Sequence, residues 1–113
     1  MEEWRRQNQF NSFNSWKGLL YAPWYEAVMK GKFLPPIEAS IDPIHQCNLQ
    51  CVHCNAGRYI RGNTLGSKLS QKRLLELVDF LGDWGVKAVC YGGGGEPTLH
   101  PDLPAAIVMT RAK

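Results

Sequence analysis

The order of the predicted elements places this chain in the α/β class, with a parallel sheet. Two short apolar segments each lead into a loop and then into a helix-forming segment, so strands and helices alternate along the chain. Strands connected in this way run parallel through right-handed crossovers. Because two strands alone are barely stable, we expect this chain to hold the front part of a larger barrel-like domain, completed elsewhere on the same or another chain.

The composition limits the function classes. The chain has 113 residues, of which 44% are apolar and 20% charged, a profile of one globular domain at most. A net charge of +3 does not indicate a nucleic-acid binder. No apolar run approaches the ~18–20 residues that cross a membrane. The first residues lack the layout of a secretory signal, so we expect a cytoplasmic protein.

Two regions differ in character. Residues 1–34 form an aromatic-rich helical extension, and residues 35–113 carry the alternating strands and helices. Pro23 suits the first turn of a helix that runs to Lys30 and stops at Gly31. Apolar residues four apart give this helix one face that we expect to pack on the main domain.

The first βα unit follows the breaker Pro35-Pro36. Ile37–Asp42 alternates as a strand, a cysteine-rich loop covers 45–54, and a long connection, of the kind that tends to be functional, covers 55–69. Ser70 is the predicted N-cap of a helix that ends at Gly85. Its apolar face should comprise Leu74, Leu77, Val78, Leu81 and Trp84.

The second unit starts with a short strand over Val86–Tyr91. This strand runs directly into Gly92-Gly93-Gly94-Gly95-Glu96-Pro97. Asp102 is positioned to cap a last helix over 103–112, which tolerates Pro104 in its first turn.

Three of the four cysteines crowd into eight residues, as Cys47, Cys51 and Cys54. Without an export signal, clustered cysteines are typical of metal ligands or redox thiols. Three thiolates leave one metal position open, whereas structural zinc sites and electron-transfer iron–sulfur clusters take four ligands. Open positions are where metal chemistry takes place.

A fourth ligand within the chain is the main alternative. His45 or His53 could complete a Cys₃His zinc site, and Cys90 could serve as a fourth cluster ligand. We expect Cys90 to be a small buried apolar residue of its strand. A small zinc-binding or iron–sulfur interaction module, or an inactive truncated fragment, are therefore the competing interpretations.

The four glycines allow the backbone to approach a ligand closely. The start of the following helix would suit an anionic group. In a parallel sheet, the loops after both strands lie at the same edge, so the cysteine loop and the glycine loop should be neighbours. Glu96 either accepts a hydrogen bond there or is an exposed carboxylate.

These residues resemble the radical S-adenosylmethionine (SAM) superfamily. The resemblance rests on the CxxxCxxC loop at Cys47, Cys51 and Cys54, followed a strand later by Gly94-Gly95-Glu96-Pro97, and covers about residue 37 onward. It implies a partial (β/α)₆ TIM-like barrel, of which this chain holds the first two βα units. It also implies reductive cleavage of SAM to a 5′-deoxyadenosyl radical, which abstracts hydrogen from a substrate that the sequence does not identify.

The resemblance also implies roles for particular residues. Cys47, Cys51 and Cys54 would hold three irons of a [4Fe–4S] cluster, and SAM would bind the fourth. The backbone of Gly94, Gly95, Glu96 and Pro97 would contact the methionine ammonium, and His53 would lie beside the adenine. A low-potential donor, flavodoxin- or ferredoxin-like, would supply the electron.

Other polar residues receive ordinary interpretations. His45 and His100 have no orienting partner that the sequence reveals. Arg58, Arg61 and Lys68 could meet a substrate anion, but a solvated loop is the expected explanation.

Overall fold

The computed structural model describes residues 15–57 and 67–113. The chain divides into two compact units, one that ends at Leu34 and one that spans Pro35–Lys113. Each unit is described by itself below.

The described part of the first unit begins with consecutive helical turns. A 3₁₀ helix over Ser15–Tyr21 runs directly into α2, Ala22–Met29. Pro23 lies in the first turn of α2, as expected, and Gly31 follows its end with a φ of 77° that favours glycine. Packing of this helix on the rest of the chain stays a prediction.

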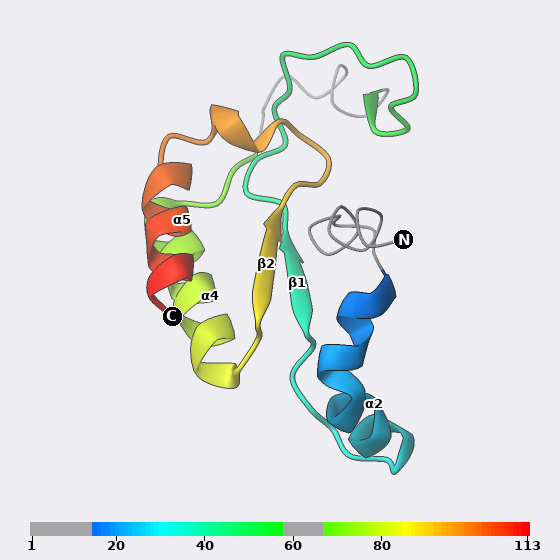
Figure 1. Ribbon diagram of the computed structural model, residues 1–113. Helices are drawn as coiled ribbons and strands as arrows, with labels where there is room; N and C mark the ends of the chain where they lie inside the picture. Colours follow the sequence, from blue (N-terminus) through cyan, green and yellow to red (C-terminus); the bar gives the residue numbers. More distant parts are fainter. Residues whose placement is uncertain (1–14, 58–66) are drawn as a thin grey trace, which may run out of the picture. The chain divides into compact units, whose positions relative to one another are not determined.

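The second unit contains a parallel two-stranded sheet, as the alternation of elements predicted (Figure 1). Strand β1, Glu38–Ile41, pairs along its whole length with β2, Ala88–Tyr91. In this register Ser40 lies opposite Cys90, and Ile41 lies opposite Tyr91. Both strands are shorter than predicted, and β2 starts late because Val86 and Lys87 still belong to the connection from the preceding helix.

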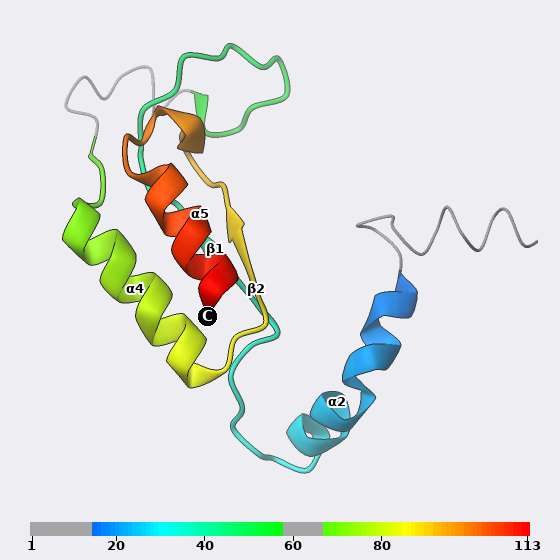
Figure 2. The same ribbon diagram turned by 60° about the vertical axis from the view of Figure 1, so that its left-hand side comes forward.

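Helices α4, Gln71–Trp84, and α5, Leu103–Ala112, cover one face of this sheet (Figure 2). The core between helices and sheet comprises Ile41, Leu74, Val78, Leu81 and Ala106. Trp84, predicted on the same helix face, is 38% exposed and stacks at a tilt on Phe80 instead. Since the face drifts around the helix, its last turn lies at the rim of the core.

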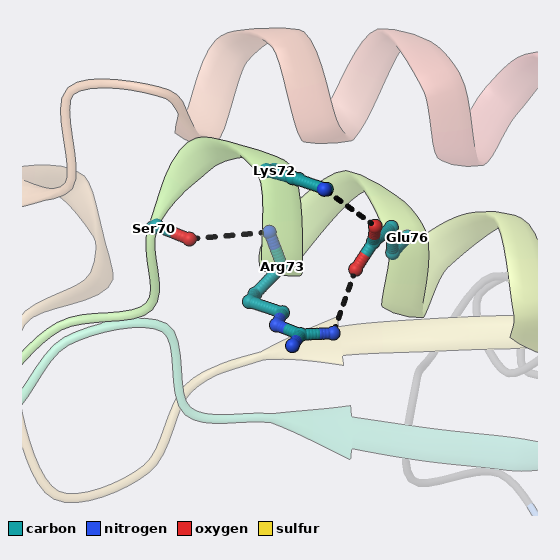
Figure 3. A network of polar contacts seen from close by, with 4 residues as sticks. All are labelled: Ser70, Lys72, Arg73 and Glu76. Carbon is teal, nitrogen blue, oxygen red and sulfur yellow. Dashed lines mark hydrogen bonds and ion pairs between the residues drawn. The ribbon is translucent and has the colours of Figure 1, made fainter.

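Both ends of α4 follow the sequence prediction. The Ser70 side chain accepts a hydrogen bond from the amide of Arg73, and Gly85 ends the helix with a left-handed φ of 98°. Lys72 and Arg73 both pair with Glu76 on the exposed side of the first turns (Figure 3). Such exposed pairs add little stability, so the cap and the apolar face are the main determinants of this helix.

The start of α5 differs in one respect from the prediction. Asp102 is the residue before the helix, but its carboxylate makes no capping bond. It accepts a hydrogen bond of 2.8 Å from the Gln71 side chain at the start of α4. The Asp102 side chain therefore joins the two helices instead of capping one.

The prediction that Cys90 is buried is wrong. Residues alternate between the two faces of a strand, so Val89 and Tyr91 pack towards α4 and α5. Cys90 and Ser40 consequently lie on the opposite face, where both are exposed. Which face the helices cover is decided by packing, and the apolar character of the strand did not reveal it.

In the two ranges that the structure describes, no helix combines the length and the apolar character needed to cross a bilayer.

Candidate cofactor site at the carboxyl ends of the strands

Two loops meet at the carboxyl ends of the parallel strands (Figure 1). The cysteine segment, defined here as residues 42–57, follows β1, and the glycine loop, residues 92–97, follows β2. Their proximity was predicted from the strand order, and hydrogen bonds between the two loops confirm it.

Main-chain contacts connect the glycine loop to the beginning of the cysteine segment. The amide of Gly94 donates to a carboxylate oxygen of Asp42 at 2.7 Å, and the amide of Glu96 donates to the carbonyl of Gln46 at 2.8 Å. Gln46 immediately precedes Cys47. The glycine loop therefore holds the residue that immediately precedes the first cysteine.

The glycines permit this contact because side chains would not fit. A Cβ at Gly95 would lie 2.5 Å from the carbonyl oxygen of Gln46, and closer still to that of Ile44. A Cβ at Gly94 would lie 2.7 Å from Nε2 of His45, and Gly93 has a φ of 114°. Only Gly92 has ordinary space around it. Glycine is thus required at Gly95 by close backbone approach and at Gly93 by a left-handed turn, whereas a side chain at Gly94 would displace the His45 ring.

The polar groups of the glycine loop favour a cation over an anion. Carboxylate or carbonyl oxygens of the chain already accept from the amides of Gly94 and Glu96, and Glu96 accepts from the amide and hydroxyl of Thr98 at 3.0 and 2.6 Å. These bonds from Thr98 hold the pKa of the Glu96 carboxyl below its ordinary value, so it is ionised near neutral pH. Since the Asp42 carboxylate accepts from the Gly94 amide and the Gln46 carbonyl accepts from the Glu96 amide, neither amide is left for an anion.

The three clustered cysteines are free thiols in one short segment. Cys47 is half-buried, and Cys51 and Cys54 are exposed. The amide of Leu49 donates to Sγ of Cys47 at 3.4 Å, and the amide of Cys54 donates to the carbonyl of Cys51 at 3.2 Å. Both local turns leave the thiols accessible to an incoming metal.

Within residues 15–57 and 67–113, no three metal-ligating side chains lie close enough together to hold a metal ion. The convergence of the thiols that their spacing allows is therefore not present in this arrangement. The donor set itself fits an iron–sulfur cluster, since three accessible thiols of one segment are available to ligate iron. Ligation would require the exposed turns of the cysteine segment to draw these thiols together.

The site also includes side chains that sequence reasoning missed. Asp42, at the end of β1, binds the Gly94 amide, and its other neighbour is the His45 ring at 3.9 Å. The position of Asp42 at a strand's carboxyl end was the available signal. His100, for which the sequence reveals no orienting partner, is buried and bonded through both ring nitrogens.

The other residues that the sequence singled out take no part in the contact between the glycine loop and the cysteine segment. His53 is exposed between Cys51 and Cys54. Lys68 is exposed and pairs through its backbone with Ile44. Arg58 and Arg61 lie outside the described residues.

Comparison with known proteins identifies relatives of this chain. The chain is 35% identical over 68 residues to the Fe-coproporphyrin III synthase of Methanosarcina barkeri. The aligned stretch covers 60% of this chain and 16% of that relative. It is also 36% identical over 70 residues to GTP 3′,8-cyclase 1 of Mycobacterium tuberculosis. This aligned stretch covers 62% of this chain and 19% of the relative. This chain thus spans less than a fifth of the length of these relatives.

No solved structure matches this chain. The profile of the radical SAM superfamily matches residues 41–113, from the last residue of β1 through both loops and α5. The match contains all three clustered cysteines and the complete glycine loop. Members of this superfamily use a [4Fe–4S] cluster and SAM. The chain belongs to the radical SAM superfamily.

Proposed function

We propose that residues 35–113 are the N-terminal portion of a radical SAM domain, preceded by a helical extension over residues 1–34. When bound, the reduced cluster and SAM supply a 5′-deoxyadenosyl radical that removes a hydrogen atom from the substrate. The contact between the Glu96 amide and the Gln46 carbonyl is the observation that carries this proposal. It connects the candidate SAM-binding loop to the residue beside the first candidate cluster ligand.

In this proposal, Cys47, Cys51 and Cys54 hold three irons of the cluster. Their thiols are free and accessible, and all three belong to one segment. Three protein ligands leave one iron for the amino and carboxylate groups of SAM. Cys90 has no part in this set, since it belongs to β2 and not to the cysteine segment.

The glycine loop receives the amino-acid end of SAM. Its amides at Gly94 and Glu96 are already bonded within the chain, and its carbonyl oxygens can accept hydrogen bonds from a ligand. Acceptors beside the ionised carboxylate of Glu96 favour an ammonium group. His53, between the second and third cysteines, is the proposed neighbour of the adenine.

The substrate stays open. The names of the two relatives refer to an iron porphyrin and to cyclised GTP, so similarity to both indicates shared radical chemistry but no common substrate. We propose that a low-potential flavodoxin- or ferredoxin-like protein reduces the cluster.

Anaerobic reconstitution of the full chain with iron and sulfide tests this proposal. We expect about four irons per chain, with matching sulfide, a visible charge-transfer band and release of 5′-deoxyadenosine after addition of dithionite and SAM. A single zinc per chain would support a zinc-binding module instead. An intact cluster that yields no 5′-deoxyadenosine would contradict the assignment of SAM cleavage to this chain.

A further inference from the structure

His100 lies between the glycine loop and α5, and it is 1% exposed. It directly follows the short 3₁₀ helix Pro97–Leu99, which begins at the last residue of the glycine loop. Nε2 of the ring lies 2.8 Å from the carbonyl oxygen of Leu69, and the amide of Asp102 donates to Nδ1 at 3.1 Å. Both nitrogens of this buried ring are therefore engaged by the main chain.

These two bonds determine the protonation state of the ring. A backbone amide can only donate, so Nδ1 of His100 must carry the lone pair. A carbonyl can only accept, so Nε2 must carry the proton that it donates to Leu69. His100 is consequently a neutral imidazole in the Nε2–H tautomer.

Leu69 continues this connection to the cysteine segment. Its amide donates to the carbonyl of Pro43 at 2.9 Å, and the amide of His45 donates to the carbonyl of Ser67 at 2.8 Å. Residues 67–69 thus run antiparallel to residues 43–45, just before Cys47. A continuous path of hydrogen bonds leads from His100 through Leu69 to the base of the cysteine segment.

We propose that His100 is a positioning residue that holds the glycine loop in register with the cysteine segment. Its Nε2–H bond to Leu69 fixes the chain just after the glycine loop on residues 67–69, which pair with residues 43–45 of the cysteine segment. The bond between Glu96 and Gln46 fixes the end of the loop itself. We call this pair of contacts, from His100 to Leu69 and from Glu96 to Gln46, the clamp, and it exists in the chain without cluster or SAM. Its expected effect on SAM binding rests on the proposed function.

Three substitutions distinguish the effect of losing the hydrogen bond to Leu69 from the effect of losing the hydrogen bond from Asp102. His100→Gln places an amide nitrogen near the position of Nε2 and can retain the donor to Leu69. His100→Asn places an oxygen near the position of Nδ1 and can retain only the acceptor for Asp102. His100→Ala retains neither group.

The first readout is hydrogen exchange of the Glu96 amide in the full chain without cluster or SAM. Because loss of one hydrogen bond is a modest effect, we expect exchange to accelerate about three- to tenfold in the Asn and Ala variants, and His100→Gln to stay near wild type. Unchanged exchange of Glu96 in all three variants would overturn the proposal. So would equal acceleration at every amide, which would indicate only general loss of stability.

A second readout uses the wild-type chain, so it does not depend on whether a variant folds. Nitrogen-15 NMR of the ring in the wild-type chain should show the neutral Nε2–H tautomer, and the opposite tautomer or an imidazolium would overturn the clamp. In reconstituted protein, we expect His100→Asn and His100→Ala to raise KM for SAM about three- to tenfold at unchanged iron content, with His100→Gln near wild type. A KM that instead follows the melting temperatures of the variants would contradict a positioning role.

These measurements also separate the two proposals. If the chain binds no cluster while the tautomer and the exchange pattern are as expected, the proposed function fails and the clamp stands. If SAM is cleaved while Glu96 exchange is insensitive to all three substitutions, the clamp fails and the proposed function stands.

Discussion

The amide of Glu96 donates a hydrogen bond of 2.8 Å to the carbonyl oxygen of Gln46. This bond joins residues that are far apart in sequence, one in the glycine loop and one immediately before Cys47. It is possible because Gly95 has no side chain to separate the two backbones. The geometry of the candidate cofactor site therefore depends on backbone contact as well as on the cysteines.

Gly95→Ala should destabilise the chain. The new methyl group would meet the carbonyl oxygens of Ile44 and Gln46, which belong to the main chain and cannot move aside cheaply. We expect a loss of about 1–3 kcal/mol in the free energy of unfolding, measured by urea denaturation. Gly92→Ala is the matched control, because the nearest atom to its Cβ would be Sγ of Cys90 at 3.9 Å. Equal effects of both substitutions would contradict the close approach at Gly95.

Thr98 should control the ionisation of Glu96. The side-chain and backbone bonds from Thr98 lower the pKa of this carboxyl, so the stability that they contribute is complete above its unfolded pKa and is lost as the pH falls through its folded pKa. Thr98→Val removes the hydroxyl bond, the largest cause, and should raise the pKa towards the ordinary value. Thr98→Ser keeps the hydroxyl and should preserve the lowered pKa.

Carbon-13 NMR titration of the Glu96 carboxyl measures this pKa directly. An unchanged pKa in the Val variant would show that the hydroxyl of Thr98 does not hold the carboxylate.

The cysteines should differ sharply in their effect on iron content. Cys51→Ala removes one of three proposed ligands and should abolish the cluster after anaerobic reconstitution. Cys90→Ala is the control and should retain wild-type iron and sulfide, because Cys90 belongs to β2 and not to the cysteine segment. A full cluster in the Cys51 variant, or its loss in the Cys90 variant, would refute the ligand assignment.

Ser70→Ala should weaken the start of α4. Its side chain accepts the Arg73 amide, and the loss of such a cap costs about 1 kcal/mol in the free energy of unfolding. Ser70→Asp keeps an acceptor at the N-cap and should restore most of the stability. Thermal denaturation of both variants against wild type makes the comparison, and an Asp variant as unstable as the Ala variant would exclude the capping role.

Much of the second unit was predictable because its signals are local. The period of apolar residues, the N-cap at Ser70 and the left-handed glycine at Gly85 each act within a few residues. The proximity of the two loops followed from strand order alone, since parallel strands place their carboxyl ends at one edge. The cysteine spacing and the glycine motif also sufficed to identify the superfamily.

Contacts between distant parts of the chain were not predictable. The bond between Gly94 and Asp42 spans 52 residues, and that between His100 and Leu69 spans 31. The strand end places Asp42 at the correct edge of the sheet, but the local sequence does not show which amide its carboxylate accepts from. It likewise does not show that His100 is buried with both nitrogens bonded. The exposure of Cys90 likewise depends on where α4 and α5 pack.

The sequence by itself thus determined the elements, their order and the chemistry of the available ligands, because these depend on residue type and short-range periodicity. Only the tertiary structure decided which face of the sheet is covered, which groups occupy the amides of the glycine loop, and how His100 connects that loop to Leu69. These features arise from packing and hydrogen bonds between segments that come together only when the chain folds.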